Sequence, residues 1–243
     1  MSSIVGLIPC AGRGTRLGTP FAKEMMPDMH HPTYRPIVMR AIEALRVAHV
    51  LDVVFTVHPS KGELLQFLGN GKQFGMTFSY CIHPSPRSLA ASINEAYHLI
   101  RDKTVCFVMP DTVVQPDDFM VSLLKSHHGN RASATLACFH TQTPWKFGMV
   151  TMDGRVVRAI DDKPSQSDTP WMWGAMVWDS ACTEAIHAFV DPSSSSEEER
   201  EPPLTDAFTA LVRQGLVRSH CFPEGRYIDL GTFPAYQAWG REA

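Results

Sequence analysis

The chain has 243 residues, enough for one large α/β domain or two small ones with a sizeable core. Its formal net charge of −3 gives no electrostatic reason to expect nucleic acid or an anionic membrane as a partner. No apolar stretch approaches the length of a membrane-spanning helix, and the chain begins without the basic segment of a signal peptide. The six cysteines show no metal-ligand spacing, so we expect reduced core thiols in a soluble cytoplasmic protein.

The first half of the chain alternates short apolar runs with helical patterns. The runs are rich in Val, Ile and Phe, as is typical of buried strands, and cover residues 4–8, 53–57, 77–81 and 105–109. Apolar residues at three- and four-residue spacing predict helices over 37–47, 61–68 and 89–100. The alternation predicts an α/β fold with a Rossmann-like, mostly parallel central sheet that is flanked by helices.

The second half has strand patterns with few helices between them. The predicted strands cover 132–140, 148–152, 156–160, 171–178, 217–222 and 226–229, and the predicted helices 204–214 and 233–240. Asp153-Gly154 is a strong hairpin signal, and the polar run at 191–203 predicts an exposed loop. We expect antiparallel additions to the sheet edge that form a lid or an acceptor pocket. With no repeat and no convincing linker, we expect one domain over 1–243.

A glycine-rich turn follows the first predicted strand. It contains Gly12, Gly14, Thr15 and Arg16, and Lys23 follows a few residues later. Glycines let backbone N–H groups approach an anion closely, and fixed cations beside them suit a polyphosphate. The alternative is a turn with solvated cations. The spacing matches neither a Walker loop nor the dinucleotide fingerprint G-x-G-x-x-G, which counts against a nicotinamide-linked oxidoreductase.

Two aspartates also follow predicted strands. Asp111 comes after the strand that ends at residue 109, and Asp229 lies between the last strand and the last helix. Each alone could be a turn former, but together they offer the hard oxygen ligands that Mg²⁺ accepts when phosphates and water complete an octahedron. The acidic pairs at 117–118 and 161–162 compete for this role, although we interpret the first as the acidic start of a helix. In a parallel sheet the carboxyl ends of the strands converge, so we expect one site where the four first-half strands end, at the glycine-rich turn, His58, His83 and Asp111.

In this order, the motifs resemble those of the sugar nucleotidyltransferase family, and most nearly those of bacterial glucose-1-phosphate thymidylyltransferases. The resemblance covers almost the whole chain. The matching segments are 12–17 (GRGTRL), 22–27 (AKEMMP), 68–92, 110–111, 147–150, 162–164 with Gly174, 203–206 (PLTD) and 228–232 (IDLGT). Any one of them is a weak signal, and their shared order is a strong one.

The resemblance implies an enzyme that transfers a nucleotidyl group from a nucleoside triphosphate, by default dTTP or UTP, to a sugar 1-phosphate or a similar phosphorylated acceptor. Pyrophosphate is released and Mg²⁺ is the cofactor. Residues 1–130 would form the nucleotide-binding half, and 131–243 the acceptor-binding half with the second metal ligand. The implied site comprises catalytic Arg16 and Lys23; nucleotide contacts at Ala11, Gly12, Gly14, Thr15, His83, Pro86 and Ser88; acceptor contacts at Gly148, Asp162, Lys163 and Gly174; and metal ligands Asp111 and Asp229.

Base and sugar recognition depart from the family pattern. The chain has Ala11 where the family has Gly, and His83 and Ser88 where it usually has Gln and Gly. It also has Thr112 in place of a common Asn and Asp162 in place of the usual Glu. An imidazole offers a base edge other donors and acceptors than an amide does. These changes leave open a CTP- or GTP-using transferase with a non-glucose acceptor, and also a non-catalytic nucleotide-sensing paralogue. Separately, the chain could form a homo-oligomer.

Overall fold

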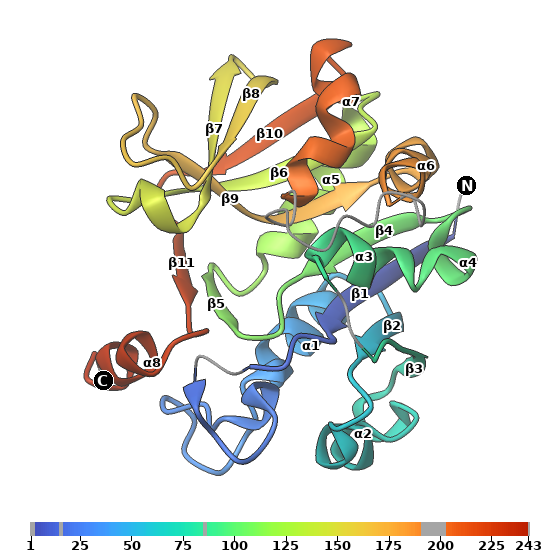
Figure 1. Cartoon of the computed structure of the whole chain (residues 1–243), viewed down its shortest axis with the longest axis vertical. Coiled ribbons are helices and arrows are strands. Elements are labelled where there is room, and N and C mark those ends of the chain that lie inside the picture. The colour runs from blue at the N-terminus through green and yellow to red at the C-terminus, as the bar shows by residue number, and fades with distance from the viewer. Residues whose placement is uncertain (1–2, 15–16, 85–86, 191–202, 243) are drawn as a thin grey trace.

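The computed structural model describes residues 3–14, 17–84, 87–190 and 203–242, and it is built on a nine-stranded sheet (Figure 1). The strands are ordered β3-β2-β1-β4-β9-β6-β10-β8-β7, so one sheet runs through both halves of the chain. Within the described residues, no helix combines the length and the apolarity that a membrane crossing requires. All six cysteines are free thiols and four of them are buried, as the sequence predicts.

The first half of the sheet is parallel. Its strands are β1 (Ile4–Cys10), β2 (Asp52–Val57), β3 (Thr77–Ile82) and β4 (Thr104–Val108). β1 lies between β2 and β4, and β2 pairs with β3, all in parallel. The carboxyl ends of these strands therefore lie at one edge of the sheet, where the glycine-rich turn leaves β1.

The second half is mixed, so the sheet as a whole is less parallel than expected. Its strands are β6 (Ala134–His140), β7 (Gly148–Asp153), β8 (Val156–Asp162), β9 (Trp171–Trp178) and β10 (Val217–Phe222). β9 pairs antiparallel with both β4 and β6, whereas β6 and β10 are parallel. The antiparallel additions are thus not confined to the edge, because β9 lies inside the sheet. Its nearly continuous apolar sequence is typical of a strand that is covered on both faces.

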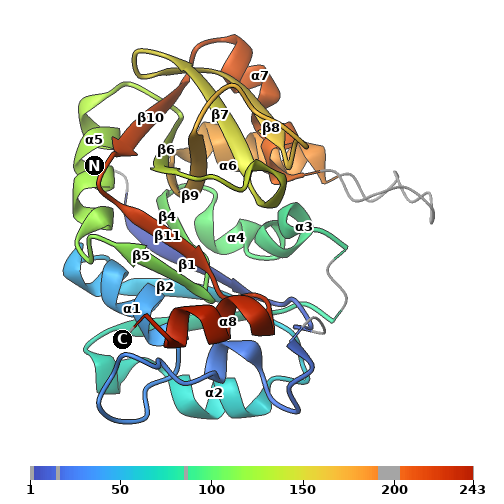
Figure 2. The same cartoon turned by 90° about the vertical axis from the view of Figure 1, so that its left-hand side faces the viewer.

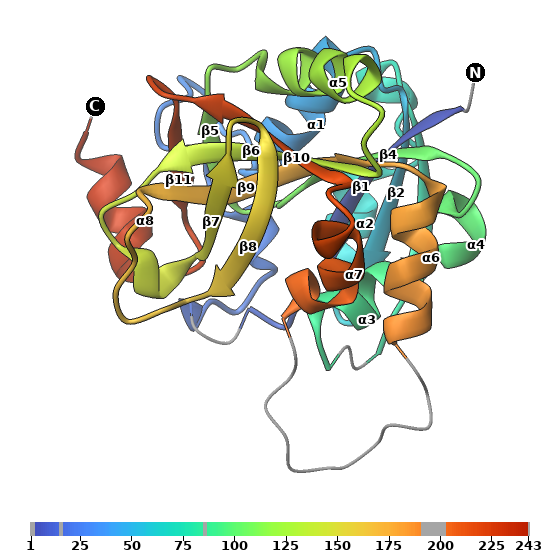
Figure 3. The same ribbon diagram turned by 90° about the horizontal axis from the view of Figure 1, so that it is seen from above.

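Two layers of helices cover the sheet, one on each face (Figure 3). One layer contains α1 (Val38–Val47), α2 (Gly62–Leu68) and α5 (Phe119–Gly129). The other contains α3 (Leu89–Asn94), α4 (Tyr97–Ile100), α6 (Ser180–Phe189), the 3-10 turn η5 (Leu204–Phe208) and α7 (Thr209–Arg213). Alternate residues of β1 serve the two cores, since Ile8 packs in the first and Leu7 in the second.

Two of the predicted helices are less regular than expected. The helix over 89–100 is divided into α3 and α4 at Ala96, whose N–H donates to the carbonyl of Ile93 (3.0 Å) in a tighter turn. The helix over 204–214 begins as the 3-10 turn η5. The acidic pair at 117–118 precedes α5, which begins at Phe119. The sequence patterns miss α6 and the short strand β5 (Thr112–Gln115). Most of the predicted loop at 191–203 lies outside the described residues.

The end of the chain returns to the first half. Strand β11 (Arg226–Asp229) pairs antiparallel with β5, and α8 (Phe233–Gly240) follows it (Figure 2). Leu17, Met26, Ile37, Val113, Leu230, Tyr236 and Trp239 form a third apolar cluster that joins these segments. The ring of Trp239 stacks on His30 with 4.4 Å between centroids, and the Tyr236 hydroxyl donates to the carbonyl of Pro27 (2.8 Å). α8 therefore fastens the end of the chain to the segment that follows the glycine-rich turn.

We expect Trp239→Ala to lower the free energy of unfolding by about 3–5 kcal/mol, because it removes a large buried side chain from this third cluster. Urea denaturation followed by fluorescence measures the change. Phe233→Ala is the control on the same helix: its side chain is 46% exposed, and we expect a change of about 0.5 kcal/mol or less. Equal losses for the two variants would show that α8 is not held by this cluster.

Candidate active site

The glycine-rich turn begins where β1 ends in the buried residues Cys10 and Ala11. Gly14 has a φ of 69°, a left-handed conformation that favours glycine, and its carbonyl accepts from the N–H of Leu17 (3.1 Å). A Cβ on Gly14 would lie 3.4 Å from Cγ of Lys23, so the turn lies against the lysine side chain. The predicted residues Thr15 and Arg16 lie outside the described residues. The structure thus brings the glycine-rich turn and the predicted lysine together.

The two predicted metal ligands are brought together by the β5–β11 pair. In its register Asp229 lies opposite Thr112, the residue that follows Asp111. The N–H of Leu230 donates to the carbonyl of Asp111 (3.0 Å), and the N–H of Gly231 donates to Oδ1 of Asp229 (2.8 Å). Asp111 is 4% exposed. Residues far apart in the sequence thus lie side by side at the carboxyl end of β4.

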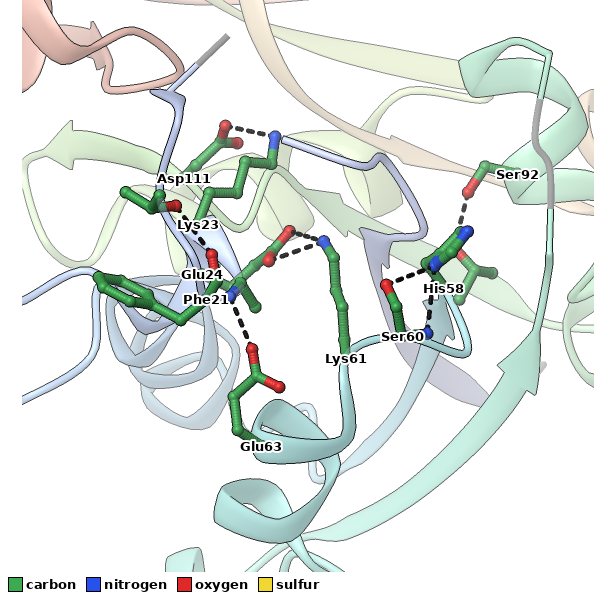
Figure 4. A network of polar contacts seen from close by, with 12 residues as sticks. Phe21, Lys23, Glu24, His58, Ser60, Lys61, Glu63, Ser92 and Asp111 are labelled. Atoms are coloured by element: carbon green, nitrogen blue, oxygen red, sulfur yellow. Dashed lines mark hydrogen bonds and ion pairs between the residues drawn. The ribbon is translucent and has the colours of Figure 1, made fainter. Parts of the chain in front are cut away.

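Lys23 forms an ion pair with Asp111, in which 2.6 Å separates Nζ from Oδ2 (Figure 4). The lysine side chain is only 13% exposed. Burial lowers the pKa of Lys23, but the nearby carboxylates of Asp111 and Glu24 outweigh this effect and raise it above its ordinary value. The ammonium group therefore stays charged at neutral pH. The site therefore presents a fixed cation beside the carboxylate of Asp111.

A second ion pair lies beneath the first. Nζ of Lys61, the residue before α2, lies 2.7 and 2.8 Å from the two carboxylate oxygens of Glu24. The side chains of Glu24 and Lys61 are 0% and 4% exposed, and burial raises the pKa of Glu24. The N–H of Ala22 donates to Oε1 of Glu63 (2.6 Å), so both neighbours of Lys23 are held by the start of α2 (Figure 4). Sequence reasoning misses Lys61 and Glu63, because charged residues at a helix start are usually solvated.

The predicted base contacts lie at the same edge of the sheet. The backbone N–H of His83, just after β3, donates to the carbonyl of Val57 (2.9 Å) at the end of β2. Ser88 caps α3, since its hydroxyl accepts from the N–H of Ala91 (3.0 Å). Pro86 lies outside the described residues. His83 and Ser88 are therefore placed near the end of β1 by the parallel pairing of the first half.

The predicted acceptor contacts lie on the β7–β8 hairpin and on β9. Gly148 is opposite Asp162 in the hairpin, and the N–H of Lys163 donates to the carbonyl of Phe147 (3.0 Å). Lys163 has a φ of 50°, which is unusual for a residue with a side chain and turns the chain sharply at the end of β8. The hairpin thus groups three of the four predicted acceptor residues.

Two aromatic side chains explain the glycines of this group. A Cβ on Gly148 would overlap the indole of Trp173, and a Cβ on Gly174 would overlap the ring of Tyr227. Tyr227 lies on β11 two residues before Asp229, and its ring meets that of Phe147 edge-to-face at 5.9 Å between centroids. Burial, helped by the charges of Asp229 and Asp111, raises the pKa of Tyr227. Tyr227 therefore lies between the predicted acceptor residues and the two aspartates. Sequence reasoning misses this role.

The sequence matches a known protein family over almost its whole length. A family model described as Nucleotidyl transferase matches residues 5–242. The chain belongs to this family. The match confirms the family expected from the motifs and the expectation of a nucleotidyltransferase enzyme.

The chain is similar to several named proteins. It is 27% identical to a glucose-1-phosphate thymidylyltransferase of Neisseria meningitidis, an alignment that covers 93% of this chain and 78% of the relative. It is 28% identical to one of Streptomyces antibioticus, over 93% of this chain and 62% of the relative. A solved structure of a putative glucose-1-phosphate thymidylyltransferase from Bacillus anthracis shares the fold, with a TM-score of 0.85, 20% identity and coverage of 99% and 95%. UTP-bound UGPase from Acinetobacter baumannii has a TM-score of 0.77, at 17% identity and coverage of 100% and 93%.

The structure also has a cavity of about 340 Å³ between α1, β5 and the start of α5. Charges of both signs line it, among them Asp28, Arg40 and Asp117. Thr112 reaches it, but Lys23 does not, and neither do the two predicted metal ligands. The cavity is therefore separate from the candidate active site.

We expect Lys61→Met to lower the free energy of unfolding by about 3–5 kcal/mol, because the buried carboxylate of Glu24 loses its partner. Urea denaturation at neutral pH measures this loss. Arg158→Met is the control, since it removes an ion pair with Asp153 whose side chains are 55% and 76% exposed. Its cost should be about 1 kcal/mol or less. A similar small cost for Lys61→Met would contradict a tightly paired Glu24.

Proposed function

We propose that the chain condenses a nucleoside triphosphate with a sugar 1-phosphate and releases pyrophosphate. The observation that carries this proposal is the Lys23–Asp111 ion pair, which lies against the glycine-rich turn and beside Asp229. The family match and the names of the relatives support the same reaction class. The default nucleotides are dTTP and UTP.

The chemistry requires two polyanions to meet for in-line attack at the α-phosphorus. Positioning and charge neutralisation supply most of the catalysis, and no covalent nucleophile of the protein is needed. Backbone N–H groups of the glycine-rich turn would bind the triphosphate. Lys23 would neutralise the α-phosphate and the incoming phosphate, and Arg16 would stabilise charge on the leaving pyrophosphate. The buried thiol of Cys10 takes no part in this scheme, because burial raises its pKa and keeps it protonated.

Asp111 and Asp229 suit Mg²⁺. They are hard oxygen donors at neighbouring positions, and Asp111 already pairs with a cation, the ammonium of Lys23. Among the described residues, no group of three or more His, Cys, Asp or Glu could hold a metal ion. A site with two carboxylates fits an ion that shares its coordination with substrate phosphates and water. When bound, Mg²⁺ would supply positive charge to the phosphates.

The acceptor would bind at the β7–β8 hairpin. Lys163 would bind its phosphate, and Gly148, Asp162 and Gly174 would line the sugar site, with the indole of Trp173 beside Gly148. The altered residues His83, Ser88 and Asp162 keep a CTP- or GTP-using enzyme and a non-glucose acceptor as the alternative. A non-catalytic nucleotide sensor is a further alternative, which predicts binding without turnover.

Asp111→Asn should lower kcat by about 100-fold or more, because it removes a charge that holds the phosphate-bound cation. Pyrophosphate release is measured across a matrix of dTTP, UTP, CTP and GTP with several sugar 1-phosphates, in the presence of Mg²⁺. Asp117→Asn, a matched change at an exposed position of a competing acidic pair, should keep kcat within about threefold. Full activity of Asp111→Asn would contradict the assignment. Binding of a nucleotide without turnover by the unaltered chain would favour the sensor.

Lys163→Met should raise KM for the sugar 1-phosphate by about 10-fold or more, because a charge-assisted contact to its phosphate is lost. KM for the nucleoside triphosphate should stay nearly constant. Steady-state kinetics with each substrate varied in turn separate the two effects. Lys146→Met, an exposed lysine of the neighbouring turn η4 (Pro144–Lys146), serves as the control. An equal rise in both KM values would contradict a specific role in acceptor binding.

A further inference from the structure

The segment that carries Lys23 has little structure of its own. It forms the single 3-10 turn η2 (Lys23–Met25), with hydrogen bonds from Met25 N to the carbonyl of Ala22 (2.8 Å) and from Met26 N to that of Lys23 (3.1 Å). One such turn is too short to be stable alone, because its nucleation is costly. The position of Lys23 must therefore be set by contacts from outside the segment.

Those contacts come from the start of α2. On one side of Lys23, the N–H of Ala22 donates to Oε1 of Glu63; on the other side, both carboxylate oxygens of Glu24 accept from Nζ of Lys61. Lys61 is itself held, since its N–H donates to the carbonyl of His58 (3.0 Å). The two residues that flank Lys23 are thus fixed to one rigid element, and Lys23 is left to face Asp111.

Stability alone does not explain why the buried pair of Glu24 and Lys61 is ionic. Burying two ions costs several kcal/mol, and apolar residues of similar volume often stabilise a protein as well or better. A two-oxygen contact to one ammonium does what apolar packing does not: it sets the direction and the distance of the Glu24 side chain. Glu24 and Lys23 are consecutive residues of one 3-10 turn. A fixed Glu24 side chain therefore fixes the backbone of this turn and with it the direction of the Lys23 side chain.

We propose that Glu24, Lys61 and Glu63 are positioning residues that hold Lys23 at the reacting phosphates, an inference that rests on the function proposed above. They act through Lys23 and Ala22 rather than on the substrate. Displacement of a catalytic group by about 1 Å can cost 100-fold in rate, so a loosened turn should lower kcat while the nucleotide still binds.

Glu63 gives the mildest test. Its side chain is exposed, so Glu63→Ala should fold normally while it frees the N–H of Ala22. We expect kcat to fall by about fivefold or more, with the Kd of the triphosphate within about twofold. Glu63→Gln keeps an oxygen acceptor at the same place and should retain kcat. Loss of kcat in Glu63→Gln, or equal kcat in both variants and the unaltered chain, would overturn the role of Glu63.

The buried pair is tested by the double variant Glu24→Leu with Lys61→Met, which replaces the ions by apolar residues of similar length. It should keep its melting temperature, yet kcat should fall by about 100-fold. The control is Asp28→Asn, which breaks the ion pair of the buried Asp28 with the partly exposed Arg40 (2.8 Å) outside the proposed machinery. It should lower the melting temperature while kcat stays within about threefold. Unchanged kcat in the double variant would overturn the proposal.

A substrate-free measurement separates this inference from the proposed function. Acetylation of Lys23 by an amine-reactive reagent, followed by peptide mass spectrometry, should be slow in the unaltered chain, where the side chain is 13% exposed and paired. It should be about fivefold faster in the Glu63→Ala and the double variants if the segment is released. Equal labelling rates overturn the positioning role whether or not the chain is active. An inactive unaltered chain with faster labelling in the variants overturns the proposed function alone.

Discussion

The candidate active site depends on one antiparallel contact, the pairing of β5 with β11. β5 begins immediately after Asp111, and β11 ends at Asp229, so the register of four residue pairs decides where the second carboxylate lies. The pairing is non-local, and its closure entropy must be repaid by packing. The third apolar cluster, which includes Val113 of β5 and Trp239 of α8, supplies that packing. The packing that stabilises the end of the chain therefore also assembles the site.

Charge at the site is arranged in two layers. The upper layer, Lys23 with Asp111, is partly accessible and in the proposed reaction would exchange partners when phosphates bind. The lower layer, Glu24 with Lys61, is almost completely buried and has no such freedom. Because the lower pair is fixed, the charged side chains of the site would need little rearrangement when substrate binds. Small rearrangement of charged groups is the condition for electrostatic catalysis.

Local patterns in the sequence are enough to predict most strands and the strand ends that carry chemistry. Val53–Phe55 and Val105–Phe107, for example, are apolar runs that no solvated element would keep. The place of β9 inside the sheet, the β5–β11 register and the partner of Glu24 could not be predicted, because each depends on residues distant in sequence. The sequence groups Asp111 with Asp229 as hard oxygen donors and the family resemblance supports the pair, whereas the structure gives its physical cause in the register of two short strands.

The predicted acceptor residues are placed by aromatic packing, whereas Lys23 and Asp111 are placed by ion pairs. Gly148 and Gly174 fall at family motif positions, yet each is also required because an aromatic ring, Trp173 or Tyr227, occupies the place of a Cβ. These rings come from β9 and β11, the two strands that join the halves of the chain. A change of acceptor would therefore need a change of packing between strands, not only a new polar contact. The indole of Trp173 lies where a Cβ on Gly148 would be, so in the proposed reaction its shape would limit the size of an acceptor bound at the hairpin.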